Sequence, residues 1–283
     1  MLEPSFLKYL ESDMKEKIIR CDRMTGGDIN DVYLLTTVSD QKIIKINTSD
    51  LFPRMFEAEA KGLQLLQKSK TFTIPDVFHA GTFENNSFLL LSYVSSGERS
   101  STFWQDFGKQ LAVLHQHTHS YFGLAYNNYI GSLPQYNTQF SNAAQFYITQ
   151  RLEPQLKIAK QNGFSFSEID RFFRNMETEI PDESAALIHG DLWSGNYLVD
   201  SLGNPGLIDP AIAYAPREMD IAMMHLFGGF NAEVFNVYQE VFPMEPGWKD
   251  RLSIWQLYYL LVHLNLFGES YYTSVCRIIE KYL

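Results

Sequence analysis

Short apolar segments separated by turn residues dominate the first third of the chain. Between Ile18 and Ile46, three segments rich in β-branched and aromatic residues are separated by Gly26-Gly27 and by Ser39-Asp40. Such segments predict strands, and similar ones recur further along. We expect strands over residues 18–21, 32–37, 42–46, 76–78 and 87–93.

Helical spacing prevails beyond a Ser95-Ser96-Gly97 hinge. Phe103, Phe107, Leu111 and Leu114 recur on one helical face, and comparable periodicity follows. We expect helices near residues 53–67, 102–119, 140–161, 166–179, 217–227, 231–242, 248–266 and 269–282. One short β-rich segment, residues 187–208, interrupts them. The pattern predicts an α+β chain whose small β-rich N-lobe covers residues 1–94 and whose larger, mainly helical C-lobe covers residues 95–283.

Composition narrows the class of protein. Of 283 residues, 45% are hydrophobic and 14% aromatic, which excludes a disordered chain. The net charge of −10 makes nucleic acid and anionic membrane unlikely partners on electrostatic grounds. The longest apolar stretch, residues 254–267, contains Gln256, His263 and Asn265, so it predicts a buried helix rather than a membrane span.

The two cysteines, Cys21 and Cys276, cannot form a disulfide framework. The first residues lack the basic leader and apolar core of a signal peptide. We therefore expect a cytoplasmic protein.

Candidate chemistry lies in the β-rich segment, which reads LIHGDLWSGNYLV from residue 187 to residue 199. Asp191 and Asn196 have the five-residue spacing of the kinase catalytic loop. A hairpin over residues 197–208 would return Asp209 to the end where Asn196 lies. Amide and carboxylate oxygens suit magnesium, so we expect Asn196 and Asp209 to bind Mg²⁺ and Asp191 to act as catalytic base. His-Gly-Asp and Ile-Asp-Pro are also common turn and strand-end sequences, and their joint order and spacing favours the kinase interpretation.

Phosphate-binding candidates lie in the N-terminal third. Residues 25–30 read TGGDIN, where glycines would let backbone N–H groups approach phosphate oxygens, although a plain hairpin turn is the simpler interpretation. Lys45 ends the third strand as a kinase phosphate-binding lysine does, with Lys42 as a competitor. Glu57 and Glu59 are the candidate partners of that lysine, and we prefer Glu59.

Other features argue against a protein kinase regulated by loop phosphorylation. Gly190 replaces the usual arginine, Asp209-Pro210-Ala211 replaces Asp-Phe-Gly, and no Ala-Pro-Glu follows. His115, His117 and His119 are expected on a polar helix face rather than in a metal site. Gly228-Gly229 is expected to end a helix.

The chain resembles the fructosamine-kinase (ketosamine-3-kinase) family, which has the two-lobed protein-kinase-like fold of aminoglycoside and choline phosphotransferases. The resemblance spans nearly the whole chain. Its marks are MFEAE at residues 55–59, HGDLWSGN at 189–196, IDPA at 208–211, REMD at 217–220 and FGGF at 227–230.

The resemblance implies ATP- and Mg²⁺-dependent phosphorylation of the sugar 3-hydroxyl of ketoamines, free or protein-bound, in a deglycation role. It implies two sets of binding residues besides Asp191, Asn196 and Asp209. Nucleotide binding is expected at Gly26, Gly27, Asp28, Ile29, Asn30, Lys45, Glu59, Leu91, Ser92, Tyr93 and Val94, the last four forming the adenine hinge. Substrate contacts are expected at Trp193, Tyr214 and Arg217.

Several alternatives stay open at this point. Trp193 fits core packing as well as stacking on a sugar. The acceptor could instead be an aminoglycoside, choline or an amino alcohol. A non-catalytic nucleotide-binding pseudokinase is the alternative of another class, although Lys45, Asp191 and Asn196 are all present. Asp28 occupies the position of a redox-sensitive cysteine in some relatives, which makes disulfide-linked dimers doubtful.

Overall fold

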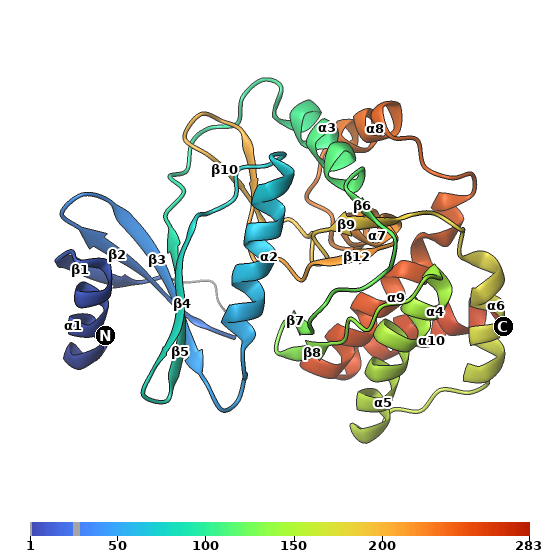
Figure 1. The fold of residues 1–283 in the computed structure, drawn as a ribbon. Helices are drawn as coiled ribbons and strands as arrows, with labels where there is room; N and C mark the ends of the chain where they lie inside the picture. The colour runs from blue at the N-terminus through green and yellow to red at the C-terminus, as the bar shows by residue number, and fades with distance from the viewer. Residues whose placement is uncertain (1, 25–28) are drawn as a thin grey trace.

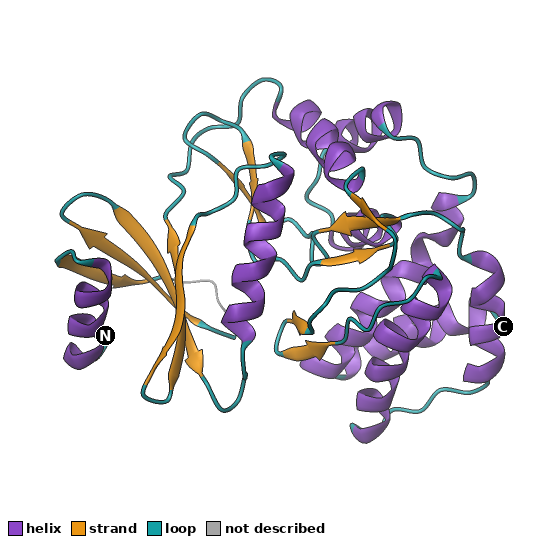
Figure 2. Cartoon of the chain, in the orientation of Figure 1, coloured by secondary structure: helices purple, strands orange, loops and turns teal. Residues whose placement is uncertain are grey.

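A twisted antiparallel sheet forms one end of the molecule, and a helical assembly forms the other (Figures 1 and 2). The computed structural model describes residues 2–24 and 29–283. The sheet has the order β1-β2-β3-β5-β4. Its strands are β1 (Ile18–Arg23), β2 (Asp31–Thr37), β3 (Gln41–Thr48), β4 (Val77–Phe83) and β5 (Asn86–Ser92).

The two faces of this sheet pack against different helices, α1 (Pro4–Met14) and α2 (Met55–Ser69). Strand β5 shows why, because its successive side chains alternate between faces. Phe88 and Leu90 pack with α1, whereas Leu89 and Leu91 pack with α2. On neighbouring β3, Ile44 joins the α1 side, so Lys45 points to the α2 side.

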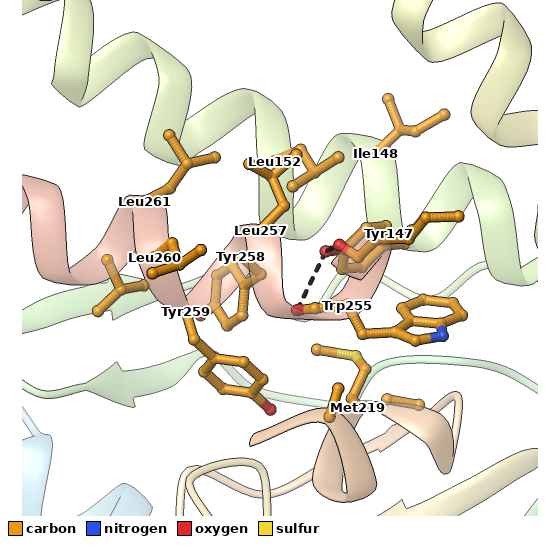
Figure 3. Packing of buried hydrophobic residues seen from close by; sticks show 14 of the residues in the cluster. Tyr147, Ile148, Leu152, Met219, Trp255, Leu257, Tyr258, Tyr259, Leu260 and Leu261 are labelled. Atoms are coloured by element: carbon orange, nitrogen blue, oxygen red, sulfur yellow. Dashed lines mark hydrogen bonds between the residues drawn. The ribbon is translucent and has the colours of Figure 1, made fainter. Parts of the chain in front are cut away.

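The helical part surrounds a central helix, α9 (Trp248–Phe267), most of whose central residues are buried. Its bulky side chains provide much of the larger core (Figure 3). The other helical elements are α3 (Phe103–His115), α4 (Ala143–Tyr147), a π-helical turn (Ile148–Leu152), α5 (Glu153–Gln161), α6 (Ile169–Glu179), α7 (Glu218–Phe227), α8 (Ala232–Val241), a 3-10 turn η2 (Glu269–Tyr271) and α10 (Tyr272–Lys281). Within the described ranges, none of the helices combines the length and apolarity needed to cross a bilayer.

Short strands within the helical part carry the loops of chemical interest. Three of them pair in the order β12-β9-β6, and two hairpins lie beside them. Their bounds are β6 (Thr118–His119), β7 (Asn128–Ile130), β8 (Leu133–Gln135), β9 (Ala185–Ile188), β10 (Tyr197–Val199), β11 (Pro205–Leu207) and β12 (Ala213–Ala215).

The expected α+β, two-lobed architecture is confirmed, and so are the five N-terminal strands and the hairpin after Asn196. The helix expected over residues 102–119 is shorter, because Thr118 and His119 pair with β9 instead. Helix α1 and the β7–β8 hairpin were not predicted. The lobe boundary at residue 94 stays a prediction; β5 ends at Ser92 and α3 begins at Phe103.

Candidate active site

The loop between β9 and β10 is held by hydrogen bonds from a buried carboxylate. Asp220, on α7, accepts from the backbone N–H groups of His189 (2.7 Å) and Gly190 (2.8 Å). Gly190 has φ +83°, and a Cβ there would lie 2.1 Å from the Ala211 carbonyl oxygen. A side chain at this position would clash with that carbonyl group, so the observed conformation of the loop requires glycine.

His189 connects this loop to the segment that carries Asp209. Its Nε2 donates to the Ile208 carbonyl oxygen at 2.9 Å, which leaves Nδ1 to accept from the N–H of Asp191 at 3.3 Å. The Ala211 N–H in turn donates to the His189 carbonyl oxygen at 3.0 Å. These bonds fix both sides of the loop relative to each other.

Asp191 and Asn196 are joined directly. The Asn196 amide donates to the Asp191 carbonyl oxygen (2.9 Å) and to its carboxylate Oδ2 (3.1 Å). The amide oxygen of Asn196 therefore stays available as a ligand. Burial, together with the charge of Asp209, raises the pKa of Asp191 to about 7, although the Asn196 hydrogen bond acts in the opposite direction.

Lys45 connects the sheet to the far side of the cleft. Its ammonium pairs with Glu59 of α2 at 2.7 Å and also with Asp209. Burial alone would lower the pKa of Lys45, but the carboxylates of Asp209 and Glu59 raise it above its ordinary value. The lysine is therefore charged at neutral pH.

The competing candidates occupy other places. Glu57 pairs with Arg54 at 2.9 Å on the exposed face of α2. Lys42 pairs with Asp40 and, at 3.5 Å, with Glu16. Lys45 and Glu59 are thus the lysine and glutamate that the fold places at the cleft.

A single cavity of about 740 Å³ brings the predicted polar residues together. Lys45, Glu59, Asp191, Asn196 and Asp209 all contribute to its lining. Its volume falls within the range of small-molecule sites, roughly 300–1,000 Å³. Within the described residues no cluster of three or more His, Cys, Asp or Glu could hold a metal. Asn196 and Asp209 contribute one amide and one carboxylate to the lining, and such a pair suits a hard cation that keeps water or phosphate ligands.

Trp193 also lines the cavity, and it is 41% exposed. Its ring lies over Gly195, where a Cβ would approach the indole to 2.2 Å. The indole is therefore a wall of the cavity rather than a core residue. Ile29 and Asn30 line it as well, whereas Gly26, Gly27 and Asp28 lie outside the described residues.

The expected adenine hinge is not part of this lining. Leu91 packs under α2, and the N–H groups of Ser92 and Tyr93 donate to the carbonyl oxygens of Asp76 and Gln41. Val94 does not line the cavity either. Adenine binding by residues 91–94 stays a prediction.

One expected substrate contact is corrected, and a second lies outside the cavity lining. Arg217 is 3% exposed, and its guanidinium is occupied by Glu183 (3.0 Å) and by the carbonyl oxygens of Phe242 and Pro243. Tyr214 lies on β12, with its ring centroid 4.8 Å from that of His119, and does not line the cavity. Arg217 therefore supports the fold around the site, whereas the substrate contact of Tyr214 stays a prediction.

The expectation of a polar helix face at His115 is also wrong. His115 is fully buried, 3.2 Å from Asp220 and 2.8 Å from the Tyr238 hydroxyl. It therefore braces the carboxylate that holds the catalytic loop. Asp220 and Tyr238 supply the hydrogen-bond partners that allow the His115 ring to be buried, although its helical spacing with His119 suggested an exposed face.

Part of the cavity wall was not predicted from the sequence. It comes from the ends of α7 and α9 and from η2, and from the β7–β8 hairpin. Helix α9 is buried around most of its circumference, so periodicity could not single out a cavity-facing stripe. The missed residues include Asn128, Tyr129, Gly131, Met223, Phe227, Tyr259, His263, Phe267 and Tyr271.

Comparison with known proteins agrees with this architecture. The family described as Fructosamine kinase matches residues 5–283. A probable ketoamine kinase from Enterococcus faecium is 39% identical over 265 residues, covering 92% of this chain and 94% of that protein. A protein-ribulosamine 3-kinase, chloroplastic, from Arabidopsis thaliana is 33% identical, covering 94% of this chain and 83% of that protein.

A solved structure extends the agreement to three dimensions. The crystal structure of a fructosamine-3-kinase candidate from Haemophilus somnus superposes with a TM-score of 0.89 at 27% identity, covering 98% of this chain and 96% of that one. The family match over nearly the whole sequence is decisive: this chain belongs to the fructosamine kinase family.

Proposed function

We propose that this protein transfers the γ-phosphoryl group of ATP to the 3-hydroxyl of a ketoamine sugar. Membership of the family and the names of its relatives support the reaction class and the kind of substrate. The observation that carries the proposal is the convergence of Asp191, Asn196, Asp209 and Lys45 on one cavity. Phosphoryl transfer needs chiefly alignment and neutralisation of charge, which such a set can provide.

Asp191 is the proposed general base. The sugar O3 attacks the γ-phosphorus, the bond between that phosphorus and the bridging oxygen breaks, and ADP leaves. The hydroxyl proton passes to the Asp191 carboxylate. Because burial raises the pKa of this carboxyl to about 7, the group can accept a proton near neutral pH.

Asn196 and Asp209 are the proposed holders of Mg²⁺, which would neutralise phosphate charge when bound. The fit rests on their donor chemistry, one amide oxygen and one carboxylate lining the same cavity. Lys45 would contact the phosphates, with Glu59 fixing the direction of its side chain. Asp209 has φ +55°, a conformation uncommon outside glycine, which directs its carboxylate toward Lys45.

The remaining assignments complete the proposal. Residues 26–30 would cover the phosphates, residues 91–94 would bind adenine, and Trp193 would stack on the sugar ring. The nucleotide would lie between an N-lobe of residues 1–94 and a C-lobe of residues 95–283. The action is proposed to take place in the cytoplasm, on free or protein-bound ketoamines.

A panel of acceptors tests this proposal. The purified protein is given ATP and Mg²⁺ with fructosyl-lysine, ribulosyl-lysine, choline or an aminoglycoside, and ADP formation is measured. We expect turnover with the ketoamines alone, and its loss in the Asp191→Ala variant while ATP still binds. Phosphorylation of choline or the aminoglycoside with the ketoamines inert would overturn the substrate assignment. Magnesium-dependent ATP binding without turnover of any acceptor would indicate a pseudokinase.

A further inference from the structure

The cavity lining includes a cluster of aromatic rings. Phe227, His263, Phe267 and Tyr271, which we call the aromatic end, come from α7, α9 and η2. The His263 ring centroid lies 4.7 Å from that of Phe227, 5.4 Å from that of Phe267 and 5.2 Å from that of Tyr271. Phe227 and Phe267 are 38% and 57% exposed, so the aromatic end opens to solvent.

Lys45 is the only lysine or arginine among the described lining residues, and it pairs with Glu59 and Asp209. The aromatic end includes no lysine or arginine. His263 donates its Nδ1–H to the Tyr259 carbonyl oxygen at 2.8 Å, and burial lowers its pKa. The aromatic end therefore has a neutral imidazole and ring faces. Such faces attract cations and offer nothing to a carboxylate.

A polar group without a partner lies in the same wall. Tyr259 is fully buried, lines the cavity, and its hydroxyl makes no hydrogen bond within the described structure. In the same core the Tyr147 hydroxyl donates to a backbone carbonyl of α9 (Figure 3). Buried hydroxyls are nearly always satisfied, so this one, beside the cavity, is available to a ligand or to a water.

The chemistry of a ketoamine relates these observations to the acceptor. Its nitrogen is on C1 and the reacting hydroxyl is on C3, so the amine lies two carbons from the atom held at Asp191. With the phosphates on the Lys45 side, the amine and its substituent face other parts of the lining. Among these, the aromatic end offers the ring faces that suit an alkylammonium group.

We propose that the aromatic end binds the amine half of the acceptor as an alkylammonium group and rejects ketoamines with a carboxylate next to the amine. This inference rests on the proposed function and adds the class of amine to it. Adducts of lysine side chains or simple alkylamines place a chain of methylenes along the rings. Adducts formed on the α-amine of a free amino acid would place a carboxylate there without a cationic partner, which is costly.

A matched pair of acceptors isolates the carboxylate. One is the fructose ketoamine formed on the α-amine of norleucine, and the other is the same adduct of norleucine amide. We expect kcat/KM to be at least about tenfold higher for the amide, a difference of about 1.4 kcal/mol. Equal values for the two would overturn the inference while leaving the proposed function intact. If neither adduct is phosphorylated while fructosyl-lysine is, the inference is overturned and the proposed function stands; if fructosyl-lysine is inert as well, the proposed function itself fails.

Phe267→Arg supplies the missing cation. The position is exposed and ends α9, where a positive charge suits the helix dipole, so the variant should fold. We expect it to reduce the preference for the amide to about threefold or less, whereas Phe267→Ala weakens turnover of the amide adduct without favouring the acid. Phe78→Arg, on exposed β4 away from the cavity, is the control for net charge and should keep the wild-type ratio. An unchanged ratio in Phe267→Arg, or the same shift in Phe78→Arg, would contradict the assignment.

Discussion

The Lys45 ammonium pairs with the Asp209 carboxylate, so one ion pair joins the N-terminal sheet to the loop after the β10–β11 hairpin. Glu59 holds the same ammonium from α2 at 2.7 Å. The consecutive elements β3 and α2 and the distant loop after β11 therefore meet at one buried cation. Because Asp209 is also a proposed metal ligand, we expect bound metal and nucleotide to compete with this pair for its carboxylate.

Lys45→Met tests that dependence. The substitution keeps most of the side-chain volume but leaves Glu59 without its partner. We expect kcat/KM to fall at least about 100-fold, and the free energy of unfolding to fall by about 3 kcal/mol, near the low end for a broken buried ion pair because Asp209 is half-exposed. Steady-state kinetics and urea denaturation measure the two effects.

Lys42→Met is the matched control for this experiment. Lys42 is on the same strand and is equally buried, but it pairs with Asp40 and Glu16 away from the cavity. We expect near wild-type kcat/KM in this variant. Similar kinetic losses in both variants would mean that Lys45 acts through the stability of the sheet rather than at the phosphates.

Asp191→Asn gives a prediction about pH. The pKa of Asp191 is about 7 in the folded protein, against an ordinary value of 3.8. Between these values the folded state holds a proton that the unfolded state has released, so this group makes the protein less stable as pH rises from about 4 to 7. Asparagine cannot titrate. We expect the variant to be inactive but to gain stability relative to wild type as pH rises to 8, in thermal unfolding without metal or nucleotide.

The pH dependence of the stability difference between Asp191→Asn and wild type tests the raised pKa of Asp191. A stability difference that stays constant from pH 4 to pH 8 would show that the carboxyl has an ordinary pKa. In wild type, kcat/KM should fall as pH drops below about 7, because the base becomes protonated.

Sequence reasoning found the parts of the site that local order determines. Asp191, Asn196 and Asp209 lie on one tight loop and the hairpin after it, so spacing alone brings them close. Lys45 was predicted because it ends the third strand, as the phosphate-binding lysine of kinases does. These relationships extend over short stretches of chain or depend on regular geometry, which is why they could be predicted.

The predictions that failed depended on long-range packing. Arg217 was expected to bind substrate, but its guanidinium is buried and already hydrogen-bonded to Glu183 and to two backbone carbonyl groups. His115 is buried because Asp220, 105 residues away, lies beside it. The aromatic end was missed for the same reason, since α7, α9 and η2 assemble it only in the folded chain.

Asn196→Ala tests the metal assignment. The change removes the amide oxygen proposed as a Mg²⁺ ligand and the hydrogen bonds that the amide donates to Asp191. We expect the Mg²⁺ concentration for half-maximal rate to rise at least about tenfold, and excess EDTA to abolish turnover in both proteins until Mg²⁺ is restored. Initial rates over a Mg²⁺ series measure this.

Asn204→Ala is the control on the same hairpin. Asn204 hydrogen-bonds Asp200 in the turn and does not line the cavity. Its Mg²⁺ requirement should match wild type. If Asn196→Ala lowers kcat but keeps the wild-type Mg²⁺ dependence, Asn196 serves only to position Asp191.

Tyr259→Phe and Tyr147→Phe form a matched pair in one core (Figure 3). Both tyrosines are fully buried, but the Tyr147 hydroxyl donates to the Ile254 carbonyl oxygen at 2.6 Å, whereas the Tyr259 hydroxyl has no partner in the described structure. Removing the bonded hydroxyl should cost about 1 kcal/mol of folding free energy and leave kinetics unchanged. Removing the unpaired one should cost no stability, because no hydrogen bond is lost.

For kinetics we expect the opposite order, with an effect in Tyr259→Phe and none in Tyr147→Phe. If the Tyr259 hydroxyl binds the acceptor, Tyr259→Phe raises KM for the ketoamine several-fold while KM for ATP stays constant. A structural role predicts the opposite, a loss of stability with both KM values unchanged. Chemical denaturation and steady-state kinetics of the two variants therefore decide whether this buried hydroxyl serves the substrate or the fold.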